Sequence, residues 1–247
     1  MKNLEGKVAI VTGGSRGIGA AIAKRLGTDG ADVVVNYNRD EAAALEVAAQ
    51  IEGLGCRTVA IQADMGDSAQ IESLFSQAMQ VFGRLDILVN NAGVSGFQAL
   101  ETIDVASYAH MFDINVRGPL LAMRQAAQYF GTQGGRVINI SSSITRSPTS
   151  HWTIYAAGKA ALEMMTACLA QELGPRHITV NAVAPGVTTT DMLHTVMPAE
   201  VQQAMTNNTA LGRLGQPDDI ADVVAFLCSH DGRWITGQTL IANGGLR

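Results

Sequence analysis

The sequence predicts one α/β domain in which helices cover both faces of a parallel sheet. Its 247 residues fit one large domain, and no linker, low-complexity tract or fixed-period repeat divides them. Short apolar runs such as Val33-Val34-Val35 are typical of strands buried on both faces, as the strands of parallel sheets are. These runs alternate with longer Ala-rich amphipathic stretches, which indicates repeated strand–helix–strand units.

The predicted elements follow one another in a regular order along the chain. Strands are expected at residues 7–11, 32–36, 58–62, 86–89, 136–140, 178–183 and 239–241. Helices are expected at residues 17–29, 41–52, 67–82, 105–130, 154–173 and 217–229. This alternation predicts a doubly wound, seven-stranded parallel sheet of the Rossmann type, with residues 1–247 in a single domain. Residues 187–215 are the least regular segment, and we expect them to form a loop insertion that contacts the substrate.

Composition argues against several classes of protein. Apolar residues make up 47% and charged residues 16%, which is typical of a well-packed globular protein rather than a disordered one. The net charge of −5 without a basic stripe argues against a nucleic-acid partner. The chain shows neither a signal peptide nor an apolar run of membrane-spanning length, so we expect a cytoplasmic protein without membrane contact. The three cysteines and five histidines are scattered, which predicts neither a disulfide framework nor a metal site.

A glycine-rich loop follows the first strand and opens the first helix, with the spacing Thr12-Gly13-x-x-x-Gly17-x-Gly19. Glycines let the backbone approach a phosphate closely, and a helix N-terminus supplies free N–H groups and positive potential. The loop therefore predicts a dinucleotide site with contacts from Gly13, Ser15, Arg16, Gly17, Ile18 and Gly19. The alternative is an ordinary glycine-rich turn between a strand and a helix.

The end of the second strand indicates which dinucleotide would bind. NAD enzymes usually carry an acid there to hold the ribose 2′-hydroxyl, whereas this chain reads Asn36-Tyr37-Asn38-Arg39. The guanidinium groups of Arg39 and Arg16 are suited to a 2′-phosphate, so we expect NADP(H) rather than NAD(H), with Asn38 and Arg39 among the contacts. The alternative is that both arginines are solvated surface charges, with Arg39 neutralised by Asp40 and Glu41.

Two further strands end in residues suited to the same site. Asp64 follows the third strand, beside Met65, and either accepts a hydrogen bond from the adenine amino group or caps the next turn. Asn90-Asn91-Ala92-Gly93 follows the fourth strand, at a carboxyl end where ligands bind in sheets of this type. We expect Asn91, Ala92 and Gly93 to contact the dinucleotide.

Tyr155 and Lys159 predict an acid–base pair. Residues four apart share a helix face, so the two side chains lie side by side. A free tyrosine has a pKa of about 10, and a nearby ammonium group lowers it, which would suit Tyr155 to proton transfer near neutral pH. Ser142 lies upstream, and its hydroxyl is suited to hydrogen-bond a substrate carbonyl. Alternatively, the three are a half-buried aromatic, a solvated lysine and an ordinary turn serine.

In combination, these motifs resemble the short-chain dehydrogenase/reductase family over essentially the whole chain. The matching features are the glycine loop, Asp64, Asn90-Asn91-Ala92-Gly93, Asn115, Ser142, Tyr155-x-x-x-Lys159, Asn181 and Pro185-Gly186. The resemblance implies that Tyr155 is the proton donor and acceptor and that Ser142 orients the carbonyl. It implies that Lys159 binds the nicotinamide ribose and lowers the tyrosine pKa, and that Asn115 holds a water of a proton relay. It also places the nicotinamide contacts at Pro185, Gly186, Thr188 and Thr190.

Within the family, the chain is most similar to the 3-oxoacyl-acyl-carrier-protein reductase group. Residues 212–217 and 235–238 are close to its pattern, and the resemblance implies a homotetramer. It also implies an acyl carrier protein as partner, and Arg176 remains at one docking position. However, residues 131–135 lack the usual basic side chains, and His151-Trp152-Thr153-Ile154 replaces a more polar approach to the tyrosine. Asn243 stands where an aspartate commonly precedes the last two glycines.

The expected function is an NADPH-dependent reduction of a ketone or 3-oxoacyl carbonyl to a secondary alcohol, with the proton supplied by Tyr155. One alternative is an NAD(P)-dependent alcohol dehydrogenase that works mainly in the oxidising direction. Another is a dinucleotide-binding protein without turnover, which the complete set of site residues argues against. The substrate is expected to be a small molecule that contacts Ser95, His151, Trp152 and Met192.

Overall fold

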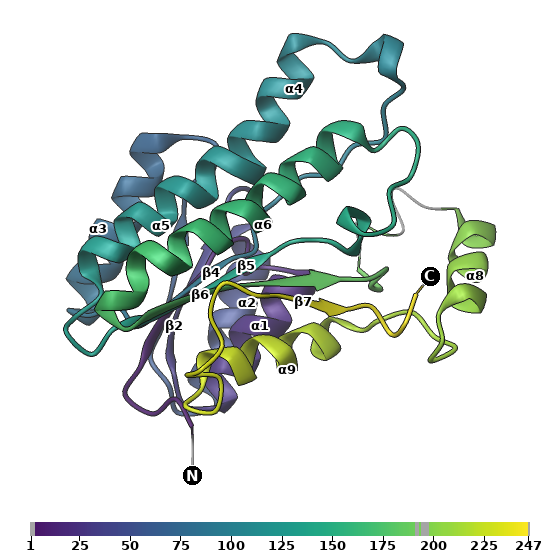
Figure 1. Ribbon diagram of the computed structural model, residues 1–247. Coiled ribbons are helices and arrows are strands. Elements are labelled where there is room, and N and C mark those ends of the chain that lie inside the picture. Colours follow the sequence, from purple (N-terminus) through teal and green to yellow (C-terminus); the bar gives the residue numbers. More distant parts are fainter. Residues whose placement is uncertain (1–2, 191–192, 194–197, 247) are drawn as a thin grey trace.

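The computed structural model describes residues 3–190, 193 and 198–246. Within these residues, seven strands form a parallel sheet in the order β3-β2-β1-β4-β5-β6-β7, which confirms the predicted fold class (Figure 1). The strands are β1 (Val8–Val11), β2 (Asp32–Tyr37), β3 (Thr58–Gln62), β4 (Ile87–Asn90), β5 (Gly135–Ile140), β6 (Ile178–Pro185) and β7 (Thr239–Ala242).

Helices cover both faces of the sheet (Figure 1). One face carries α1 (Gly17–Thr28), α2 (Glu41–Glu52) and α9 (Pro217–Cys228). The other carries α3 (Ser68–Phe82), α5 (Gly118–Tyr129) and α6 (Thr153–Leu173), with α4 (Val105–Phe112) extending this layer. Each face therefore needs its own hydrophobic core.

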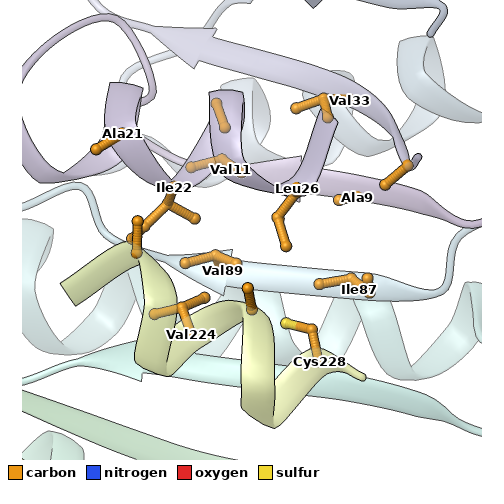
Figure 2. Close-up of a cluster of buried hydrophobic side chains, with 14 of the residues drawn as sticks. Ala9, Val11, Ala21, Ile22, Leu26, Val33, Ile87, Val89, Val224 and Cys228 are labelled. Atoms are coloured by element: carbon orange, nitrogen blue, oxygen red, sulfur yellow. The ribbon is translucent and has the colours of Figure 1, made fainter. Parts of the chain in front are cut away.

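The alternation of side chains along the strands divides the core into these two halves. Val11 of β1 belongs to the cluster under α1 and α9, whereas its neighbour Ile10 belongs to the cluster under α3 and α5. Figure 2 shows Ile22 of α1 and Val224 of α9 beside Val89 of β4, and all three side chains are fully buried. The apolar runs of the sequence are continuous in the inner strands, such as β1, β4 and β6, because these strands are covered on both faces.

The predicted long helical region over residues 105–130 is confirmed, with a π-helical turn in its middle. Helix α4 ends at Phe112, a π-helical turn η2 (Asp113–Arg117) follows, and α5 begins at Gly118. Pro119 in the first turn of α5 has no N–H to donate. Asn115 lies in this π-helical turn, and its side chain hydrogen-bonds the backbone of Val94 in another loop.

The segment 187–215 is more regular than the sequence indicates. It contains helix α8 (Ala199–Asn208), none of whose residues is buried, and this explains why no apolar periodicity announces it. The base of the segment is closed by backbone bonds from Thr189 N to Gly215 O at 2.9 Å and from Gly215 N to Val187 O at 3.0 Å. The predicted substrate contact Met192 lies outside the described residues.

The expected functional residues lie together at the carboxyl-terminal ends of the strands. Strands β2 and β3 lie on one side of β1, and β4 lies on its other side with β5 to β7 beyond it. The loops after β1 and β4 therefore lead in opposite directions and leave a crevice where they separate. Such a switch point is where open parallel sheets bind ligands. The glycine loop follows β1, Asn91 follows β4, and Ser142 follows β5.

At the amino-terminal ends of the strands, Asp86 anchors β4 to β1. Its carboxylate accepts hydrogen bonds from Arg84 Nη2 at 2.7 Å, Arg84 Nε at 2.8 Å, Val8 N at 3.0 Å and Lys7 Nζ at 3.3 Å. Burial alone would raise the pKa of Asp86, but the bonds from Arg84 and Val8 and the nearby positive charges outweigh it and lower the pKa. The ionised carboxylate therefore stabilises the fold.

We predict that Asp86→Asn lowers the free energy of unfolding at pH 7 by about 1–3 kcal/mol. Because the folded-state pKa lies below the unfolded value, this stabilisation is fully present above about pH 4 and is lost as the pH falls through the folded-state pKa. Urea unfolding of both proteins at pH 7 and pH 3 measures the difference. The exposed Asp231→Asn is the control, and a difference that stays constant with pH would show that the charge of Asp86 is not responsible.

Candidate active site

The glycine loop is fastened to the loop after β4 by hydrogen bonds. The Thr12 hydroxyl accepts from the backbone N–H groups of Asn91 and Ala92, both at 3.0 Å. The Asn91 amide donates to Thr12 O at 2.9 Å and Gly13 O at 3.0 Å. A residue that the sequence did not single out completes the junction, because Asn36 Oδ1 accepts from Gly13 N at 3.1 Å. These bonds fix the glycine loop, residues 12–19, where the two halves of the sheet meet. We call this loop the glycine cradle.

The cradle fits a dinucleotide diphosphate. Gly13 and Gly17 have φ values of +62° and +54°, which glycine adopts readily. A Cβ on Gly19 would lie 2.1 Å from Gly13 O, so the helix approaches the loop closer than any side chain permits. The N-terminus of α1 has no side-chain cap, which leaves its first N–H groups available to bind a phosphate. Ser15 lies in this loop and Ile18 in the first turn of α1, and both are partly buried.

Arg16 and Arg39 lie at the surface around this cradle. In the described part of the chain, neither guanidinium takes part in an ion pair or a hydrogen bond. The Asp40 carboxylate accepts from Ala43 N, and Glu41 hydrogen-bonds Tyr37, so neither acid is committed to Arg39. The alternative in which these acids neutralise Arg39 is therefore not what the structure shows. The exposed Asn38 precedes Arg39, and its carbonyl accepts from the Gln62 side chain.

Asp64 caps the turn after β3, as one of its two alternatives predicts. Its Oδ1 accepts from Gly66 N at 2.7 Å, and its own N–H donates to the Gln70 side chain. The neighbouring Met65 is buried, and a Cβ on Gly118 would lie 2.2 Å from Met65 O. The turn is therefore packed tightly against the start of α5.

The predicted catalytic side chains meet where α6 passes the end of β5. Lys159 is buried, and its Nζ donates to Ile140 O at 2.8 Å, which excludes a solvated lysine. The same Nζ lies 5.7 Å from the centre of the Tyr155 ring. Ser142, directly after β5, hydrogen-bonds Tyr155 through its side chain and also accepts from Ile144 N at 3.3 Å. Strand, turn and helix thus bring the three groups together.

The protonation of this group corrects one expectation. Burial raises the pKa of Tyr155, and the hydrogen bond with Ser142 lowers it by less, so the pKa lies above rather than below its ordinary value. Burial also lowers the pKa of Lys159 to about 8. The low dielectric disfavours both the phenolate and the ammonium, whereas the sequence argument counted only their attraction. Near neutral pH Tyr155 is therefore a neutral phenol able to donate a proton.

Asn115 clamps the loop that follows β4. Its Oδ1 accepts from Val94 N at 2.9 Å and its Nδ2 donates to Val94 O at 2.8 Å. A Cβ on Gly93 would lie 3.1 Å from Asn115 Oδ1 and 3.6 Å from Lys159 Nζ, so Gly93 lies against both side chains. The Asn115 side chain thus has a clamping contact that the family resemblance does not imply, and its predicted water contact stays a prediction.

The residues after β6 close the cradle from another side. A Cβ on Gly186 would lie 2.8 Å from Asn243 Cα, so the last loop of the chain packs directly against this glycine. Asn243 Nδ2 donates to Leu246 O at 3.0 Å, a hydrogen bond that an aspartate carboxylate could not make, which gives the departure at this position a structural reason. Thr188 donates to Gly186 O at 3.0 Å. Pro185 is the last residue of β6, and Thr190 Cγ2 would lie 3.2 Å from a Cβ on Gly17.

Glu163 is a site residue that the sequence did not single out. On α6, its carboxylate accepts from Ser141 Oγ at 2.7 Å and Thr145 Oγ1 at 2.8 Å, and it pairs with Arg146 at 3.1 Å. These three residues surround Ser142 on both sides. Spacing four residues after Lys159 and eight after Tyr155 puts Glu163 on the same helix face, and this signal was available in the sequence.

The expected substrate residues lie in two loops beside Tyr155. His151 and Trp152 precede α6, and Ser95 lies in the loop after β4. The Trp152 ring centre is 5.6 Å from that of Tyr155. Phe97 joins them although it was not among the expected contacts, with its ring centre 4.8 Å from that of His151. Rings from two distant segments of the chain are thus brought to the catalytic tyrosine.

Comparisons with known proteins agree with this geometry. A family profile described as enoyl-(acyl carrier protein) reductase matches residues 13–247. An uncharacterized oxidoreductase from Methylorubrum extorquens is 49% identical over 251 residues, which cover 100% of both chains. A crystal structure of a short-chain dehydrogenase from Burkholderia cenocepacia in complex with NADP is 44% identical, with a TM-score of 0.93 over 99% of both chains. The angucycline C-6 ketoreductase LanV with bound NADP is 40% identical, with a TM-score of 0.93 over 99% of this chain and 96% of that chain.

The chain therefore belongs to the short-chain dehydrogenase/reductase family and is an oxidoreductase, as the sequence motifs predict. In the described part of the chain, no helix is both long enough and apolar enough to cross a bilayer. Among the same residues, His, Cys, Asp and Glu side chains form no group of three or more able to hold a metal ion.

We predict that Glu163→Ala lowers kcat/KM for the carbonyl substrate by about 10-fold or more, since the turn that carries Ser142 loses its anchor and misplaced groups cost about that much. Binding of the dinucleotide, measured by fluorescence titration, should be unchanged because the cradle lies on other loops. Glu163→Gln keeps an oxygen that can accept from both hydroxyls and should restore most of the activity. Equal losses in both variants, or a parallel loss of dinucleotide affinity, would refute the positioning role.

Proposed function

We propose that this chain is an NADPH-dependent reductase that converts a ketone or 3-oxoacyl carbonyl to a secondary alcohol. One observation carries the proposal: a neutral Tyr155 hydroxyl is hydrogen-bonded to Ser142 and lies beside the buried Lys159, at the edge of the sheet that also holds the glycine cradle. A protonated phenol paired with a second hydroxyl suits a carbonyl oxygen that gains negative charge.

The side chains divide the chemistry among themselves. When bound, NADPH supplies a hydride to the carbonyl carbon. The Ser142 hydroxyl donates a hydrogen bond to the carbonyl oxygen and orients it. The Tyr155 hydroxyl transfers its proton to that oxygen as negative charge develops there. The Lys159 ammonium, still largely protonated at neutral pH with a pKa of about 8, stabilises the tyrosinate that forms.

The arginines support NADP(H) as the dinucleotide. No acid stands at the tip of β2, and the uncommitted guanidiniums of Arg16 and Arg39 are suited to the 2′-phosphate. Two similar proteins, LanV and the Burkholderia dehydrogenase, hold NADP in their crystal structures. The proposed contacts are Gly13, Ser15, Arg16, Gly17, Ile18, Gly19, Asn38, Arg39, Asp64, Met65, Asn91, Ala92, Gly93, Tyr155, Lys159, Pro185, Gly186, Thr188 and Thr190.

The structure also bears on the direction of the reaction and the form of the substrate. Reduction starts from the neutral phenol of Tyr155, which burial favours, whereas oxidation of an alcohol starts from its phenolate, so the rates of the two directions should differ in their pH dependence. Arg176, the remaining carrier-protein contact, donates instead to Ala127 O at the end of α5. The guanidinium stays exposed, so the case for a free small molecule rests on residues 131–135, which lack the basic side chains suited to an acidic carrier. By family resemblance, we propose a homotetramer in the cytoplasm.

Tyr155→Phe should lower kcat for ketone reduction by about 10²- to 10⁴-fold, since it removes the proton donor and leaves the ring in place. Oxidation of NADPH followed at 340 nm measures turnover, and isothermal titration measures NADPH affinity, which should change by less than about 2-fold. Tyr129→Phe on α5 is the matched control and should retain full activity. Turnover retained by Tyr155→Phe would refute the proposed mechanism.

Arg39→Ala should lower kcat/KM with NADPH by about 10- to 100-fold and leave kcat/KM with NADH nearly unchanged. The reason is the loss of charge-assisted hydrogen bonds to the 2′-phosphate, which NADH does not carry. The double variant with Arg16→Ala should lose the remaining preference. Arg233→Ala, at the far edge of the sheet, serves as the control, and a parallel loss with both dinucleotides would contradict the assignment.

A further inference from the structure

A series of aromatic rings leads from the catalytic tyrosine to the surface. The Tyr155 and Trp152 ring centres are 5.6 Å apart with planes at 67°, and the Trp152 and Phe97 centres are 6.2 Å apart at 76°. Phe97 in turn lies 4.8 Å from the His151 ring. All three spacings fall in the range in which aromatic rings attract one another. We call Phe97, His151 and Trp152 the aromatic wall.

Specific backbone contacts hold the aromatic wall in place. Gln98 N donates to His151 O at 2.8 Å and thereby joins the loop after β4 to the loop before α6. His151 has φ of +66°, a left-handed conformation that non-glycine residues rarely adopt. On the other side of Phe97, the backbone of Val94 is clamped by the Asn115 side chain. The loop after β4 is therefore held both before and after Phe97. Backbone strain and clamps of this kind gather at ligand-binding sites.

The aromatic wall is built for a ligand rather than for the core. The Phe97 residue is 64% exposed, whereas the aromatic residues that stabilise the fold, such as Phe75, are fully buried. Trp152 is partly buried and bridges between exposed Phe97 and partly buried Tyr155. The edge-to-face packing of Phe97 on Trp152 leaves ring surface that a further flat ring can cover.

We propose that the substrate is a ketone on a planar aromatic ring system, which stacks on Phe97 and Trp152 while its carbonyl oxygen meets Ser142 and Tyr155. The proposal rests on the proposed reductase function and narrows its substrate class. A flat ring gains attraction from each aromatic residue that it meets, beyond simple burial of apolar area, which corresponds to roughly 3- to 10-fold in affinity per ring. A saturated skeleton or a flexible acyl chain gains only the burial.

Two ketones of equal carbon number test the aromatic wall. 2-Tetralone carries an aromatic ring that is not conjugated with its carbonyl, and 2-decalone is its saturated counterpart, so their ratio of kcat/KM reports the skeleton rather than the intrinsic reactivity. Wild type should favour 2-tetralone. Phe97→Leu and Trp152→Leu should each lower the ratio by roughly 3- to 10-fold. Trp234→Leu, which removes a 95% exposed tryptophan outside the aromatic wall, should leave the ratio unchanged.

A binding measurement separates this proposal from the reductase function. The chain has two tryptophans, so Trp234→Phe leaves Trp152 as the only one, and its fluorescence reports ligands at the wall. With NADP⁺ present in place of NADPH, 2-tetralone should quench this fluorescence saturably and more tightly than 2-decalone. Adding Phe97→Leu should weaken the 2-tetralone Kd by roughly 3- to 10-fold.

The outcomes are distinct. Reduction of both ketones with a ratio that neither wall variant changes would overturn the aromatic substrate class and leave the reductase function standing. Saturable, Phe97-dependent binding of 2-tetralone without oxidation of NADPH would support the aromatic wall and overturn the reductase function. Absence of both binding and turnover with either ketone would overturn the aromatic wall.

Discussion

The junction between Thr12 and Asn91 is the interaction on which the rest of the site depends. These residues follow β1 and β4, two strands that are neighbours in the sheet but belong to different halves of the fold. The Thr12 hydroxyl and the Asn91 amide satisfy backbone groups of the opposite loop, so neither loop can move without leaving buried polar groups unpaired. The glycine cradle and the loop toward Phe97 diverge from this one point. The dinucleotide side and the substrate side therefore have a common fixed reference.

Burial sets the chemistry of the catalytic group. Helix α6 is tied to the sheet by Asn139 Nδ2, which donates to Thr166 Oγ1 at 2.8 Å, and by Lys159 Nζ, which donates to Ile140 O. These contacts bury Lys159 and partly bury Tyr155, and burial shifts the pKa of each group toward its neutral form. Glu163 adds a partly buried carboxylate that holds the turn around Ser142. The close packing of α6 on β5 and β6 thus determines both where the Tyr155 and Lys159 side chains lie and how their pKa values shift.

The two loops at the mouth of the site differ from the cradle in their chemistry. The cradle is made of glycines and backbone N–H groups, which suit phosphates, whereas the mouth presents aromatic side chains, which suit flat apolar groups. Asn115 links the two regions because its clamp on Val94 fixes the start of the loop that ends at Phe97. Asn115 itself lies in the π-helical turn between α4 and α5.

The sequence by itself determined the features that depend on neighbours along the chain. Apolar runs buried on both faces predict a parallel sheet, a glycine spacing predicts the phosphate loop, and a four-residue spacing places Lys159 beside Tyr155, since all three follow from local backbone geometry. Only the tertiary structure decided the rest. The clamp of Asn115 needs Val94, the direction of the Tyr155 pKa shift needs the packing that buries it, and the aromatic wall needs two loops that are far apart in the chain. Contacts and burial of this kind arise only when distant segments meet, so no local pattern in the sequence encodes them.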